Sequence, residues 1–154
     1  MNPDVLSTPG HLISLAARGF ARLSEARLKP RGFGVGHLPV LVALQDGEAS
    51  TQRDLARFAK TEQPPMAQML ARMERDGLIT RSPNPIDRRS SRIVLTQTAQ
   101  ARLPDAIGVL LRGNQDALSG FSDEEAEQFV VLLKRLIANL DRLSAETSQL
   151  ADPE

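Results

Sequence analysis

One stretch constrains the fold of this 154-residue chain more than any other: TQRDLARFAKTEQPPMAQMLARMERDGLITRSPNPIDRRSSRIVL, from Thr51 to Leu95. It opens with Thr51 and Asp54 at the spacing of a helix-capping box, and a short amphipathic segment follows as far as residue 59. The expected apolar side of this segment consists of Leu55, Phe58 and Ala59. After a turn of about three residues, a second amphipathic segment spans residues 63–76. The side of this segment that is expected to face the core holds Met66, Met69, Leu70 and Met73. The pattern predicts two short helices packed at a steep angle.

The second half of this stretch predicts a β-hairpin. Gly77 stands where a helix end favours a left-handed residue, and two short apolar runs, 78–81 and 92–95, read as strands. Between the runs lies a charged loop, residues 82–91, with two prolines, an asparagine and the triplet Asp-Arg-Arg. The whole stretch therefore predicts a helix-turn-helix followed by a hairpin wing.

The motifs of this stretch resemble those of the MarR (multiple antibiotic resistance regulator) family of winged-helix transcription factors. The matching segments are TQRDLA at 51–56, EQP at 62–64, RMERDGLITR at 72–81, NPIDRR at 84–89 and LT at 95–96. In element order the resemblance extends over roughly residues 12–143. It implies a fold that is mainly α with a small β-hairpin wing: a winged helix-turn-helix in an α-helical homodimer frame.

The rest of the chain supplies the expected helical frame. Residues 1–9 read as a disordered tail, and residues 10–45 hold two helices interrupted by the PRGFGVG turn. Residues 46–96 form the predicted winged helix-turn-helix domain, in which residues 48–50 are expected to add a very short strand. Thr96 is the predicted cap of a long helix, and a second capping box at Ser122 starts the last one. Residues 10–45 and 97–150 together make a discontinuous helical dimerisation region.

The terminal helices carry more apolar surface than one small domain needs. The first helix is apolar on two sides, and the last repeats apolar residues at 4-3-4-3 spacing, which is typical of a coiled-coil seam. A second copy of the chain is the simplest cover for this surface, and the resemblance also implies a homodimer. The residues expected at the interface are Leu12, Leu15, Phe129, Leu133, Leu136, Leu140 and Leu143.

Charge is unevenly distributed although its sum is zero. Residues 51–92 hold nine Lys or Arg and five Asp or Glu, whereas residues 121–154 hold three Lys or Arg and eight Asp or Glu. This split predicts one basic face and one acidic end, and two solvated faces with a chance bias are the alternative. The chain has no cysteine, no apolar run long enough to span a membrane and no signal peptide, so a cytoplasmic protein without disulfides or thiol switch is expected.

Double-stranded DNA is the predicted partner. The second helix of the motif fits a major groove, where its N-terminal and exposed side chains would meet base edges. These side chains are Gln63, Pro64, Pro65, Gln68 and Arg72. The amide of Gln68 suits an adenine, whereas the two prolines offer only apolar contact. Phosphate contacts are expected from Thr51, Gln52 and Arg53 at the start of the first motif helix. A two-fold dimer further predicts a pseudo-palindromic operator.

The resemblance assigns roles to three residues of the wing. It implies that Arg89 enters the minor groove, that Arg88 contacts phosphate or the groove, and that Asp87 holds the loop in shape. Narrow minor grooves carry an enhanced negative potential, which explains a preference for arginine there. A merely solvated charged loop is the alternative.

An enzyme or a metal site finds little support, because only His11 and His37 are present, without a catalytic triad or metal cluster around them. No cofactor is expected. The resemblance implies a pocket for a small aromatic or anionic effector, lined from the first, second and fifth helices. Arg18, Phe33 and His37 are its candidates. Arg18 serves solubility in the alternative interpretation, and His37 caps a helix or belongs to the core.

The sequence thus predicts a sequence-specific DNA-binding regulator, a repressor released by a small ligand. Two alternatives remain open: a winged-helix protein that binds DNA constitutively without an effector, and a helical adaptor that binds proteins.

Overall fold

The computed structural model describes residues 4–151, which are mainly helical and contain one two-stranded antiparallel sheet. The predicted fold class, mainly α with a hairpin wing, is confirmed. The chain divides into two compact units, Met1–Asn114 and Gln115–Glu154. Among the described residues no helix combines the length and the apolarity that crossing a membrane requires.

The first unit begins with a 3-10 turn, η1, and a long helix. The described part of the expected disordered tail differs from the prediction, because η1 is followed directly by a helix whose cap is Thr8. The hydroxyl of Thr8 accepts a hydrogen bond from the backbone N–H of His11 at 3.4 Å. Residues 1–3 of that tail lie outside the described residues. The elements are η1 (Val5–Ser7), α1 (Pro9–Leu28), η2 (Lys29–Arg31) and α2 (His37–Gln45).

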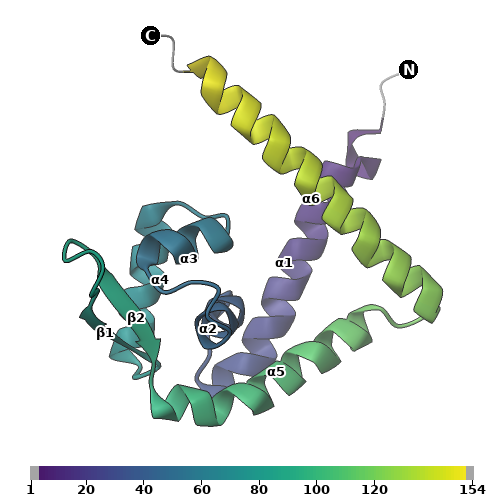
Figure 1. Ribbon diagram of the computed structural model, residues 1–154. Helices are drawn as coiled ribbons and strands as arrows, with labels where there is room; N and C mark the ends of the chain where they lie inside the picture. The colour runs from purple at the N-terminus through teal and green to yellow at the C-terminus, as the bar shows by residue number, and fades with distance from the viewer. Residues whose placement is uncertain (1–3, 152–154) are drawn as a thin grey trace. The chain divides into compact units, whose positions relative to one another are not determined.

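The predicted helix-turn-helix and wing follow (Figure 1). The helices are α3 (Gln52–Phe58) and α4 (Gln63–Arg75), and the strands are β1 (Ile79–Pro83) and β2 (Ser91–Leu95). Thr51 caps α3, since its hydroxyl accepts from the N–H of Asp54 at 3.2 Å. Gly77 after α4 has a φ of 75°, the left-handed conformation that its position predicts. The strands pair antiparallel from Ile79–Leu95 to Pro83–Ser91.

Two expectations within this region are wrong. Residues 48–50 form no strand; a single hydrogen bond from the N–H of Ile93 to the carbonyl of Ser50, at 2.7 Å, takes its place. Phe58 and Ala59, expected on the apolar side of the first motif helix, are both exposed, Phe58 at 46%. The helix spans only seven residues, and its buried side is already formed by Leu55 and Ala56.

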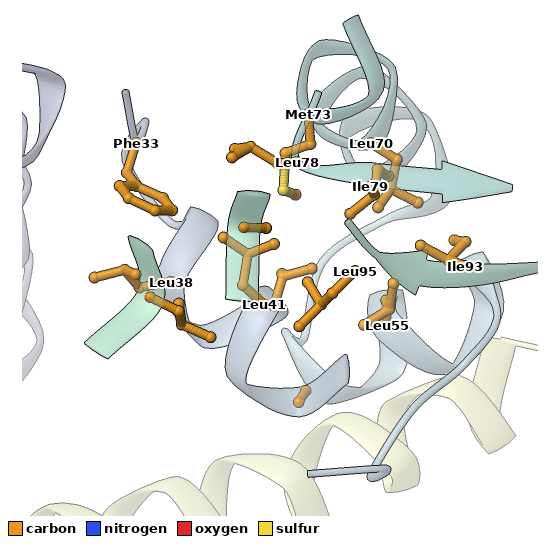
Figure 2. Close-up of a cluster of buried hydrophobic side chains, with 14 of the residues drawn as sticks. Phe33, Leu38, Leu41, Leu55, Leu70, Met73, Leu78, Ile79, Ile93 and Leu95 are labelled. Carbon is orange, nitrogen blue, oxygen red and sulfur yellow. The ribbon is translucent and has the colours of Figure 1, made fainter. Parts of the chain in front are cut away.

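One apolar core holds the first unit together. Figure 2 shows Leu41 of α2, Leu55 of α3 and Leu70 of α4 in a cluster with apolar residues of both strands. The predicted core side of α4 is confirmed for Met66, Leu70 and Met73, which are fully buried, and Met69 packs against them partly buried. The core therefore fixes the side of α4 that remains exposed.

Helix α5 (Gln97–Ala117) contributes to the same core. Thr96 caps it as predicted, because its hydroxyl accepts from the N–H of Ala99 at 3.1 Å. The helix continues through Pro104 without interruption. Its buried face consists of Ala99, Leu103, Ala106 and Val109.

The second unit consists mainly of α6 (Asp123–Ala151). Its start is a complete capping box: the N–H of Glu125 donates to the hydroxyl of Ser122 at 3.1 Å, and the N–H of Ser122 donates to the carboxylate of Glu125 at 3.3 Å. The rings of Phe121 and Phe129 lie 6.1 Å apart. None of the 29 residues of α6 is buried within the described chain, although its apolar seam is long. Phe129, Leu140 and Leu143 of this seam are exposed.

Candidate nucleic-acid interface

A cleft of about 520 Å³ lies between the start of α3 and the loop that joins β1 to β2. It brings together six of the residues predicted to contact DNA: Thr51, Gln52, Arg53, Gln63, Asp87 and Arg89. The remaining lining residues are Asp54, Arg81, Asn84, Ser90 and Ser91. The lining thus contains three arginines, two aspartates and several residues with hydroxyl or amide groups. Such a lining suits a phosphate backbone, which takes hydrogen bonds from arginines, hydroxyls and amides alike.

The wing loop is shaped by its own side chains. The carboxylate of Asp87 accepts a hydrogen bond from the N–H of Arg89 at 2.9 Å, and the side-chain oxygen of Asn84 accepts from the N–H of Ile86 at 3.0 Å. The amide nitrogen of Asn84 also donates to the hydroxyl of Ser90 at 2.9 Å. The carboxylate of Asp87 thus ties down the backbone of Arg89 within the loop.

A side-chain hydrogen bond joins the two helices of the motif at the cleft. The amide nitrogen of Gln52 donates to the side-chain oxygen of Gln63 at 3.1 Å. Gln52 lies at the beginning of α3 and Gln63 at the beginning of α4. The bond therefore brings the expected phosphate contacts of α3 next to the end of α4 that is expected to meet bases.

The other predicted DNA contacts lie outside this cleft. Pro64, Pro65 and Gln68 are exposed on α4, and Arg88 is exposed in the wing loop. Arg72 is exposed as well, but it lines a different cavity, described below. Apart from Gln63 at its first position, the exposed side of α4 is thus a surface outside the wall of the cleft.

Sequence reasoning missed Arg81. It was assigned only to a strand, yet it lines the cleft, and its guanidinium Nε lies 2.8 Å from Oε2 of Glu74 in α4. The available signal was its position in the strand that leads into the wing loop, six residues before the Asp-Arg-Arg triplet. Asn84, Ser90 and Ser91 were also missed, because their role depends on the loop conformation.

A second cavity, of about 420 Å³, contains two of the three effector candidates. Phe33 and His37 line it, whereas Arg18 does not. The other lining residues are Glu25, Lys29, Gly32, Gly34, Val35, Arg72 and Asp76. The walls therefore come from α1, the following turn, the start of α2 and the end of α4, where the prediction expected α5 instead of α4. Arg18 lies about two turns of α1 before Glu25, on the side of Glu25 away from the turn that follows α1, and it is not among the lining residues.

His37 is held closely in this cavity. Its Nδ1 accepts a hydrogen bond from the N–H of Gly34 at 3.0 Å, and a Cβ at position 34 would lie 2.7 Å from the imidazole Cε1. The side chain is 6% exposed, and burial lowers the pKa of His37 below its ordinary value. The negative charge of Asp76 raises this pKa and the positive charge of Arg72 lowers it further, both by less than burial does. A neutral imidazole is therefore the form that the fold favours.

Protonation of His37 should destabilise the fold. The unfolded chain binds this proton near the ordinary pKa of about 6.5, whereas the folded chain binds it only at lower pH. The free energy of unfolding should therefore fall as pH drops below about 6.5 and level off below the folded-state pKa. Urea unfolding should show a larger loss for the wild type than for His37→Gln. His11→Gln should behave like the wild type, and equal losses in all three proteins would contradict the assignment.

Comparison with known proteins places these features in a family context. Residues 36–91 match the family model described as MarR family, which confirms the resemblance seen in the motifs. A MarR transcriptional regulator from Methanosarcina mazei Go1 superposes with a TM-score of 0.80 at 23% identity, over 87% of this chain and 96% of that chain. A mutant MarR from E. coli complexed with operator DNA has a TM-score of 0.78 at 22% identity, over 87% of this chain and 99% of that chain. BpsR of Bordetella bronchiseptica is regulated in its DNA binding by 6-hydroxynicotinic acid. It has a TM-score of 0.80 at 20% identity, over 88% of this chain and 97% of that chain. At these identities the likeness to the solved structures concerns the fold.

Proposed function

We propose that this chain, whose residues 36–91 carry a MarR-family winged helix, is a sequence-specific DNA-binding transcriptional regulator that acts as a homodimer. The observation that carries the proposal is the arginine-lined cleft between α3 and the wing, next to the exposed side of α4. The similar fold of a MarR protein complexed with operator DNA supports this assignment. As a DNA-binding regulator the protein is expected to work in the cytoplasm.

In the proposed complex each part of the winged helix meets a different feature of the duplex. Helix α4 enters the major groove, where Gln68 and the first-turn residues Gln63, Pro64 and Pro65 meet base edges. The wing inserts Arg89 into the adjacent minor groove, with Arg88 beside it. Thr51, Gln52 and Arg53 hold the phosphates between the two grooves.

The uncovered seam of α6 supports a homodimer. Phe129, Leu140 and Leu143 are exposed in the single chain, and Leu12 and Leu15 of α1 are exposed as well. A second copy would cover these surfaces at a two-fold interface. Two winged helices then bind half-sites with centres roughly 10 bp, or about 34–36 Å, apart.

Selection of genomic fragments by the purified protein tests the DNA-binding function. We expect enrichment of fragments that share a pseudo-palindrome, with an affinity that falls steeply as salt concentration rises. Failure to enrich any DNA at low salt would contradict the proposal and favour the protein-binding adaptor.

We further propose that a small aromatic acid releases the protein from DNA, so that it is a repressor controlled by a ligand. The cavity around Phe33 and His37 supports this function, because one of its walls is the end of α4 itself. Lys29 and Arg72 supply positive charge for a carboxylate, and Phe33 and Val35 supply apolar surface. The regulation of BpsR by 6-hydroxynicotinic acid supports the same class of ligand. The ligand must prefer an arrangement of α4 that does not fit DNA, since equal affinity for both states shifts nothing.

A titration of the protein–DNA complex with aromatic acids tests the effector hypothesis. A compound that binds should raise the melting temperature of the free protein and lower its affinity for DNA. His37→Ala should weaken this response and leave DNA binding without ligand unchanged. Arg18→Ala is the control and should respond like the wild type, because Arg18 does not line the cavity. If no acid in a broad set changes melting temperature or DNA affinity, the protein binds DNA constitutively.

A further inference from the structure

The wing presents one apolar side chain that has no role in the fold. Ile86, near the tip of the loop between β1 and β2, is 95% exposed, more than any other large apolar side chain of residues 4–151. Its neighbours in the chain are Pro85 and Asp87. The fold gains almost nothing from an isoleucine there, because almost none of the stabilisation that burial of such a side chain provides is realised.

Ile86 is nevertheless held in a defined conformation. Its N–H donates to the side-chain oxygen of Asn84 at 3.0 Å, and the following turn is closed by the bond from the N–H of Arg89 to Asp87. Pro85 restricts the backbone on the other side. The side chain itself is β-branched and stiff at χ1. Little conformational entropy is left to lose when a partner covers it.

The surroundings of Ile86 indicate the chemistry of that partner. Arg88 and Arg89 lie two and three residues further along the same loop, and both are exposed. A partner must therefore combine a dense negative charge with an apolar surface narrow enough for one side chain. The minor groove of DNA has this combination, because phosphates form its rims and the C–H groups of deoxyribose form its walls. Proteins that enter minor grooves often place isoleucine or another aliphatic residue there.

We propose that Ile86 packs against the deoxyribose walls of the minor groove that the wing enters, and so contributes affinity that depends on groove shape but not on salt. This inference rests on the proposed DNA-binding function. The cations of the wing displace counterions and make binding salt-dependent, whereas an apolar contact releases none. Ile86 and Arg89 thus contribute to binding in two separable ways.

Binding of a selected DNA fragment by variants over a series of salt concentrations tests the proposal. Ile86→Ser should lower the affinity about tenfold for each wing, and so about 100-fold for the dimer, at every salt concentration; tenfold corresponds to burial of most of one aliphatic side chain. The slope of log affinity against log salt should remain that of the wild type. Ile86→Val should restore most of the affinity, and the heat-capacity change on binding should be less negative for Ile86→Ser.

Val94→Ser is the matched control, because Val94 is also exposed on the hairpin, at 40%, but lies on β2 away from the loop. It should bind like the wild type. The proposal is overturned if Ile86→Ser binds like the wild type, or if its loss is accompanied by a lower salt slope. Failure of the wild type to bind any DNA would instead overturn the proposed function. A normal affinity of Arg89→Ala would overturn the placement of the wing.

Discussion

Leu140→Asp is expected to abolish the homodimer. In sedimentation experiments at micromolar concentration the wild type should behave as a dimer, and the variant as a monomer or as unfolded chain. Leu140 lies in the middle of the α6 seam and is 52% exposed in the single chain, so it is available to a partner helix. An aspartate there would place an unpaired carboxylate in an apolar interface at a cost of several kcal/mol. Leu136→Asp should have the same effect.

Ala138→Asp separates loss of the interface from loss of the helix. Ala138 is exposed on α6, two residues before Leu140, and so points about 160° away from it. It receives the same new charge in the same helix, yet the variant should remain dimeric. A monomeric wild type, or a dimeric Leu140→Asp protein, would contradict the proposed interface.

Arg89→Ala should weaken operator binding by roughly 1–3 kcal/mol, the range for a specific arginine contact. The guanidinium lines the cleft and is exposed, and the hydrogen bond to Asp87 uses only the backbone N–H of Arg89. The substitution should therefore leave the loop and the fold intact. Fluorescence anisotropy with the selected DNA measures the loss, and circular dichroism checks the fold.

Arg53→Ala gives the contrast to Arg89→Ala. Arg53 lies in the first turn of α3, on the opposite wall of the cleft, where a phosphate contact is expected. Its loss should weaken binding to all DNA sequences about equally and lower the salt slope by about one for each protomer bound. If Arg89→Ala binds normally while its spectrum is unchanged, the minor-groove role of the wing is wrong.

The winged helix was predictable because the signals that delimit it are local. Thr51, Gly77 and Thr96 mark helix ends through a hydrogen bond or a left-handed backbone that involves only near neighbours. The apolar side of α4 follows from helical periodicity alone. The family resemblance added roles for Asp87 and Arg89 that periodicity cannot supply.

The two cavities were less predictable, because their walls depend on how elements pack. Arg72 was assigned to the DNA-facing side of α4, and Asp76 had no assigned role, yet both line the cavity of His37. Their placement depends on the turn between α1 and α2 lying against the end of α4, which no local pattern specifies. Arg81 was missed for the same reason, since its partner Glu74 belongs to another element.

The shared core of α5 and the winged helix has a consequence for modularity. Leu103 and Ala106 of α5 are buried in the same cluster as Leu41, Leu55 and Leu70. Residues 46–96 alone would therefore leave an apolar surface open to water, although they contain the whole wing and both motif helices. The DNA-contacting part is therefore not expected to fold when it is moved alone into another protein. Gene fusion or recombination must transfer it together with α2 and the first half of α5. New regulators of this architecture should thus arise by substitution at exposed positions of α4 and the wing, and not by exchange of the winged helix as a separate piece.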